Sequence, residues 1–297
     1  ESLASEKDAS RLTAIYLQIG KDLTAEIQAA EPKRAVELRS SFSDFLTTMA
    51  EREQQTYGSL LWVAETSTEF GESSAESAEA KQFHARAADA YQAILDNAAA
   101  NRDFCSANTV AAIRIRLATS CQRAGRFEQA LKLLNSLLTL QPNSFKMQTT
   151  AALALQEWGA TTDENERLLE SIQGYGDSIW GWGKLSVTLQ RHINGGTGKP
   201  EYADLMRQAR YQIALARRDY ALAQTGEDKT GQLQKAITEI RTFAQLDESL
   251  AGKWWQKIDE VYQMIQKDLG ETPKSIQSEF QKKPAAPETT SPSKDAS

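Results

Sequence analysis

Residues 111–144 read AAIRIRLATSCQRAGRFEQALKLLNSLLTLQPNS, and the stretch that follows, 145–178, repeats much of this pattern. Residues of the same kind recur at a spacing of 34 positions: Ala118 and Ala152, Gln122 and Gln156, Gly125 and Gly159. The series continues into a third stretch with Ser186, Leu189 and Gln190. A period of this length is typical of proteins built from repeated helix pairs, in which each pair buries its apolar face against its neighbours.

Within the first of these stretches, apolar residues three or four apart predict two helices. Leu117, Ala118 and Cys121 share one face of the first helix, and a turn at Gly125 leads into the second. The second helix is expected to bury four residues: Ala130, Leu134, Leu137 and Leu138. Pro142 then stops it. At these residues the sequence resembles the tetratricopeptide repeat family, which implies a right-handed α-solenoid, that is, a superhelix of antiparallel helix pairs.

The rest of the chain is also expected to be helical. Only Pro32, Pro142 and Pro200 precede residue 270, each between apolar runs of helical spacing, and no window shows the alternation of a strand. We therefore predict an all-α fold in three parts: an N-terminal helical hairpin cap over 1–55, a repeat domain over 56–270, and a disordered tail over 271–297. The tail prediction rests on its Pro, Ser and Thr content.

The composition excludes several functions. The chain has 297 residues, 40% of them hydrophobic and 25% charged, which is typical of a folded protein. Its formal net charge of -6 argues against a nucleic-acid partner. There is no run of 18 apolar residues, so no membrane span is expected. The sequence leaves the cellular compartment open.

No catalytic, cofactor or metal site is expected. The two histidines, His84 and His192, have no cysteine or second histidine at ligand spacing. Cys121 falls at a repeat position that Leu155 fills in the next repeat, so we expect a buried thiol that packs as a small apolar residue. The glycine-rich loop 195–200 lacks the residues of a phosphate-binding loop, since Pro200 follows its lysine.

The family resemblance also implies which side chains line a concave groove. Carried over position by position, the expected groove residues are Arg116, Thr119, Arg123, Lys146, Thr150, Leu153, Trp180, Lys184 and Arg191. Five of these nine are basic, so a mildly basic groove is expected in an acidic protein. Trp180 and Trp182 lie two apart on one expected helix, and we predict that one of them faces the groove or solvent.

These features predict a non-catalytic protein–protein interaction scaffold whose groove takes up a protein or peptide partner. A basic groove would attract an acidic segment. The alternative is a structural or assembly subunit of a larger complex, or a self-assembling solenoid that grips no peptide.

Overall fold

The computed structural model describes residues 14–15, 18–27, 29–51, 55–74, 77–247 and 252–280. Within these ranges the chain is helical and contains no strand, as predicted, apart from one isolated β-bridge between Tyr175 and Ile179. The chain divides into two compact units, Glu1–Gly181 and Trp182–Ser297. The division falls inside 56–270, the segment expected to form one repeat domain. In the described part, no helix is both long and apolar enough to cross a bilayer.

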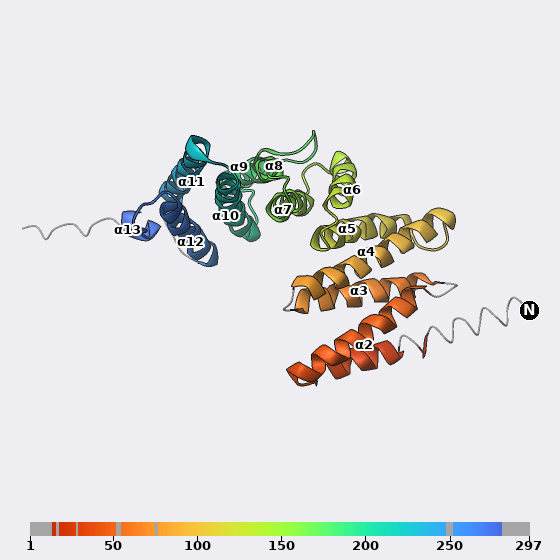
Figure 1. Ribbon diagram of the computed structural model, residues 1–297. Coiled ribbons are helices and arrows are strands. Elements are labelled where there is room, and N and C mark those ends of the chain that lie inside the picture. Colours follow the sequence, from red (N-terminus) through yellow and green to blue (C-terminus); the bar gives the residue numbers. More distant parts are fainter. Residues whose placement is uncertain are drawn as a thin grey trace, which may run out of the picture. The chain divides into compact units, whose positions relative to one another are not determined.

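The first unit is a succession of helices, each packed on the next along the chain (Figure 1). After a helical stretch at 18–27, the helices are α2 (Pro32–Glu51), α3 (Tyr57–Ser73), α4 (Ser77–Ala100), α5 (Ala107–Arg123), α6 (Phe127–Leu140), α7 (Phe145–Thr161) and α8 (Glu166–Gln173). In addition, α5 touches α7, two helices further along. Helices α5 and α6, and then α7 and α8, are the two pairs that the 34-residue period predicts.

Local sequence signals set the helix ends in this unit. Helix α3 begins with a reciprocal cap: the Ser59 N–H donates to Thr56 Oγ1 (3.1 Å) and the Thr56 N–H donates to Ser59 Oγ (3.0 Å). Helix α5 begins where Ser106 Oγ accepts from the Thr109 N–H. Gly125 joins α5 to α6 with a φ of +79°, a conformation that glycine adopts without strain.

Two clusters of buried side chains hold the unit together. The first cluster reaches from Ile27 to α6 and includes packed aromatic rings from α2, α3 and α4, with ring centroids 5.4 Å apart for Phe42 and Phe70 and 5.5 Å apart for Phe70 and Phe83. The second cluster joins α5, α6 and α7 and is aliphatic. Cys121 is fully buried, as predicted, and burial raises the pKa of its thiol to about 11. The thiol therefore stays protonated at neutral pH.

The second unit contains α9 (Gly181–Asn194), apart from its first residue, together with α10 (Pro200–Leu222), α11 (Gly226–Leu246), α12 (Lys253–Asp268) and α13 (Ile276–Phe280). Helix α10 packs against both α11 and α12. Half-buried ion pairs reinforce these contacts, with Arg217 bound to Glu239 of α11 (2.7 Å) and Arg218 to Asp268 of α12 (2.6 Å).

The predicted disordered tail has an ordered beginning, so the prediction was wrong for residues 271–280. Ile276 is fully buried, and its N–H donates to Asp259 Oδ1 at 2.6 Å. Glu279 accepts from the Tyr262 hydroxyl (2.9 Å). Together with the Lys274 N–H, which donates to Gln266 Oε1 (2.6 Å), and the ion pair of Arg241 with Glu279 (3.2 Å), these contacts dock the short segment in spite of its polar composition. Residues 281–297 of the predicted tail, and 1–13 of the predicted hairpin, lie outside the described residues.

Candidate functional site

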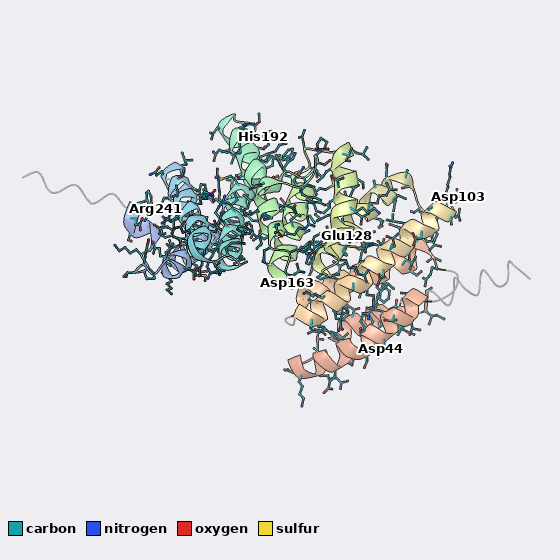
Figure 2. The ribbon with its side chains drawn as sticks, turned by 45° about the horizontal axis from the view of Figure 1, so that its top comes forward. Asp44, Asp103, Glu128, Asp163, His192 and Arg241 are labelled. Carbon is teal, nitrogen blue, oxygen red and sulfur yellow. The ribbon has the colours of Figure 1, made fainter. Side chains whose placement is uncertain are left out.

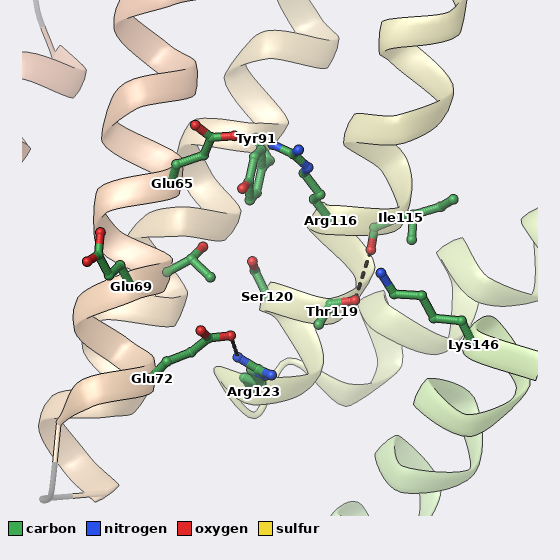
Figure 3. Close-up of a pocket in the computed structure, with 11 residues that line it drawn as sticks. Glu65, Glu69, Glu72, Tyr91, Ile115, Arg116, Thr119, Ser120, Arg123 and Lys146 are labelled. Atoms are coloured by element: carbon green, nitrogen blue, oxygen red, sulfur yellow. Dashed lines mark hydrogen bonds and ion pairs between the residues drawn. The ribbon is translucent and has the colours of Figure 1, made fainter. Parts of the chain in front are cut away.

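An open cleft of about 400 Å³ lies in the first unit between α3, α5 and the start of α7 (Figure 3). Its lining comprises Glu65, Thr68, Glu69 and Glu72 from α3, Tyr91 from α4, Ile115, Arg116, Thr119, Ser120 and Arg123 from α5, and Lys146 from α7. We call it the α3–α5 cleft.

The two walls of the α3–α5 cleft carry opposite charges. Glu65, Glu69 and Glu72 are four and three residues apart along α3, and Figure 3 shows the carboxylates of Glu65 and Glu72 directed toward α5. Arg116 pairs with Glu65 at 2.5 Å, and Arg123 pairs with Glu72. The members of each pair are 51 residues apart in the sequence, so α3 and α5 run parallel with matched turns.

A tyrosine connects the first ion pair to the core. Tyr91 lines the cleft beside Thr68 and Arg116, and burial raises the pKa of its hydroxyl against the opposing effect of these two neighbours. The hydrogen bond with Glu65 is the main cause of a raised pKa at Arg116. Arg116 is therefore paired with Glu65 and lies beside Tyr91 in the wall of the cleft.

A buried histidine lies beside the second ion pair. His84 of α4 is 5% exposed, and its imidazole lies so close to Gly71 that an added Cβ there would come within 2.6 Å of it. Its buried Nδ1 has no hydrogen-bond partner in the described part. Burial lowers the pKa of His84, the Arg123 charge lowers it further, and Glu72 opposes both. The imidazole is thus kept neutral next to the cleft.

Four of the nine expected groove residues meet in this cleft: Arg116, Thr119, Arg123 and Lys146. Thr150 and Leu153 lie on α7, half-buried, and do not line it. The Thr150 hydroxyl instead donates to the carbonyl of Lys146. Lys184 and Arg191 lie exposed on α9, in the second unit.

The prediction for the paired tryptophans was wrong. Trp180 is only 8% exposed and Trp182 is fully buried, so neither faces solvent. The argument required both residues on one helix, but α9 begins at Gly181, whose φ is +65°. Trp180 precedes the helix and packs edge-on against Phe145, with ring centroids 6.4 Å apart.

The glutamates of α3 are the residues that sequence reasoning missed. The resemblance to the repeat family is specific only from residue 111, so the groove was assembled from later helices. The signal was nevertheless present as Glu65, Glu69 and Glu72 on one helical face. With three carboxylates opposite three cations, the cleft is balanced in charge, and the expected excess of positive charge is absent from its lining.

The cleft chemistry is that of charged and hydroxyl side chains that can exchange partners with a polar ligand. Within the described ranges, no three His, Cys, Asp or Glu residues gather as a metal site would require. Comparison of the chain with protein-family models, with curated proteins and with solved structures finds no match.

Proposed function

We propose that the protein is a non-catalytic interaction scaffold, with helix pairs arranged as in tetratricopeptide repeats, and that it binds a segment of another protein in the α3–α5 cleft. The observation that carries the proposal is the meeting of Arg116, Thr119, Arg123 and Lys146 in one open cleft. The resemblance to the repeat family implies these positions, and α3, α5 and α7, which supply all but one of the lining residues, are the first helices of successive pairs, as a concave groove would require.

The charges of the cleft indicate how a partner would be held. Arg116 and Arg123 already have carboxylate partners on α3, whereas Lys146 is exposed and forms no ion pair within the described ranges. An acidic side chain of a partner would therefore bind most readily at Lys146, where no existing ion pair has to be broken. Acidic groups that reach the arginines must compete with Glu65 and Glu72, so binding is expected to weaken as salt rises.

A blocked cleft tests the proposal. Thr119 lies in the cleft between the two ion pairs (Figure 3), so Thr119→Trp fills the space without removing a charge. The matched control is Ser136→Trp at an exposed position of α6 outside the cleft. Partners recovered from the native cell with the wild-type protein should be lost with Thr119→Trp and kept with Ser136→Trp. Equal recovery with both variants would contradict the proposal.

A structural or assembly role is the second candidate, and the ion pairs favour it. Arg116, Arg123 and Arg126 each bind a carboxylate of an earlier helix, Glu65, Glu72 and Asp89. In this role these cations join alternate helices, α3 to α5 and α4 to the start of α6, and need no partner. Light scattering of the purified protein separates the two candidates, because a self-assembling protein forms oligomers alone, whereas a peptide-binding scaffold does not require them.

A further inference from the structure

A second and larger cleft, of about 830 Å³, lies in the first unit between α6, the end of α7, α8 and the turn that follows α8. It shares no lining residue with the α3–α5 cleft. Its lining comprises Glu128, Leu131, Lys132, Asn135 and Thr139 of α6, Trp158 of α7, Arg167 of α8, and Tyr175, Gly176, Asp177 and Ser178 of the turn. We call it the α6–α8 cleft.

One wall of the α6–α8 cleft is a stack of rings around a guanidinium group. Arg167 Cζ lies 4.5 Å from the ring centroid of Trp158 and 5.4 Å from that of Tyr175. Phe127 supports Trp158 from behind, with nearly parallel rings 6.2 Å apart. Arg167 also binds Glu164 (3.2 Å) and Glu170 (2.7 Å). The guanidinium is therefore fully engaged, and the wall is formed before any ligand arrives.

The turn that carries Tyr175 is also fixed. The Tyr175 N–H donates to the carbonyl of Ile179 (3.1 Å), which closes the turn on itself. Gln148 Nε2 donates to the carbonyl of Ser178 (2.8 Å), and the hydroxyls of Ser178 and Thr139 lie 3.3 Å apart. Tyr175 is thereby presented to solvent, and its side chain is 39% exposed although Arg167 lies over its ring.

Two carboxylates and two cations line this cleft, and one of the cations is already neutralised. Glu128 and Asp177 line it and form no ion pair in the part of the chain that the structure describes, and Lys132 is the one lining cation besides Arg167. Figure 2 shows Glu128 on α6 and Asp163 ahead of α8. Arg167 is bound to two further carboxylates, Glu164 and Glu170, so the lining residues and their ion-pair partners together hold four carboxylates and two cations. The field at the cleft therefore favours a cation.

We propose that the α6–α8 cleft binds an extended peptide segment that carries arginine or lysine side chains. A cation of the segment packs on the exposed surface of Tyr175 and pairs with Asp177, in the way that Arg167 already packs on the same ring. A second cation reaches Glu128. The polar side chains of Asn135 and Thr139, exposed on α6 between these points, hydrogen-bond the backbone of the segment.

The test uses the full chain and a fluorescein-labelled tetraarginine peptide, with tetraglutamate and tetraglycine peptides of the same design as references. Fluorescence anisotropy should show that the protein binds tetraarginine but neither tetraglutamate nor tetraglycine. The binding of tetraarginine should weaken as the salt concentration rises. Tyr175→Ala should weaken it about threefold or more. The double variant Glu128→Gln/Asp177→Asn should weaken it about tenfold.

The control separates a site from general attraction to an acidic protein. Asp103→Asn/Glu227→Gln removes two exposed carboxylates elsewhere and changes the net charge by the same amount. It should leave tetraarginine binding within about twofold of the wild-type value. Equal weakening by both double variants, or binding unchanged in Tyr175→Ala, overturns the proposal. Thr119→Trp in the α3–α5 cleft should have no effect, so this site can fail or succeed independently of the proposed function.

Discussion

The two repeats of the first unit have the same length but differ in how they use it. In 111–144 the second helix, α6, has 14 residues, whereas in 145–178 the second helix, α8, has 8. The residues that α8 does not use form the connection 162–165 and the turn that presents Tyr175. The shorter helix of 145–178 thus leaves residues for the fixed turn that lines the α6–α8 cleft, while the helices before it pack regularly.

Equivalent positions of the two repeats also meet different surroundings. Arg114 is exposed on α5, but its counterpart Gln148 is 1% exposed. Gly125 adopts a positive φ in open space, whereas its counterpart Gly159 lies within α7, where an added Cβ would come within 2.8 Å of the Leu168 backbone nitrogen. A shared period therefore fixes where a residue lies along the repeat, and the neighbouring repeat decides what it contacts.

The largest effect is expected at Gln148, which joins the closing turns of both repeats. Its Nε2 donates to the carbonyls of Pro142 (3.0 Å) and Ser178 (2.8 Å), and its Oε1 accepts from the Trp180 N–H (2.8 Å). Gln148→Ala leaves three backbone groups without this partner, so the free energy of unfolding should fall by about 3 kcal/mol. Urea denaturation followed by circular dichroism measures the change.

The matched control for this prediction is Arg114→Ala, the same position one repeat earlier. Because Arg114 is exposed, the free energy of unfolding should change by less than about 0.5 kcal/mol. Similar losses for the two variants would mean that the two repeats do not differ in the way described.

The second prediction concerns a position that the two repeats treat alike. Ala118 and Ala152 are both fully buried. Replacement of either by leucine overpacks the interior, and we expect a loss of about 1–3 kcal/mol in each case. Ala112→Leu, on the exposed side of α5, should be close to neutral. A loss at only one of the two buried alanines, measured by the same denaturation experiment, would show that the repeats are not equivalent there. Ala112 serves as the control because Ala285, an alanine of the predicted tail, lies outside the described residues.

The third prediction concerns Gly125 and Gly159, where glycine is required for different reasons, backbone conformation at the first and lack of space at the second. Gly125→Ala places a Cβ at φ +79° with nothing within 4 Å, and Gly159→Ala forces a Cβ against Leu168. Each should cost about 1 kcal/mol, the first from backbone strain and the second from overpacking offset by better helix propensity.

Asparagine distinguishes the two causes, because it tolerates the left-handed conformation but is larger than alanine. Gly125→Asn should therefore be milder than Gly125→Ala, and Gly159→Asn should be worse than Gly159→Ala. The same ranking of asparagine and alanine at both positions in thermal denaturation would contradict this assignment.

How far the sequence predicts the molecule depends on whether a residue is governed by its own repeat. Cys121 and Ala118 belong to the period, and their burial follows from it. Four of the nine expected groove residues line the α3–α5 cleft, at positions of α5 and α7 that the family resemblance implies. The pairing of Arg116 with Glu65 does not follow, since it depends on the parallel alignment of α3 with α5, 51 residues apart. Likewise, the docking of Ile276 depends on contacts with α12, and these cannot be predicted from the composition of residues 271–297 alone.

The smallest expected effect lies at Arg123 and Glu157, which occupy the same repeat position with opposite charges. Arg123 pairs with Glu72 in a largely exposed ion pair, so Arg123→Gln should cost less than about 1 kcal/mol. Glu157 is half-buried, and burial is the main cause of its raised pKa, against the opposing effects of the Gln122 hydrogen bond (2.6 Å) and the Arg123 charge.

The sign of the pH dependence at Glu157 follows from this shift. With a folded-state pKa above the unfolded value, the native state binds more protons in the window between the two, so this residue's contribution to stability falls as pH rises through it. Glutamine resembles the protonated acid and does not titrate. Glu157→Gln should therefore match the wild-type protein below the ordinary glutamate pKa of about 4.3 and exceed it in unfolding free energy at pH 7. Urea denaturation at a series of pH values from 4 to 7 measures the difference. A constant difference across the series would exclude the raised pKa, and a lower stability of Glu157→Gln at pH 7 would show that the ionised carboxylate stabilises this repeat as Arg123 does the preceding one.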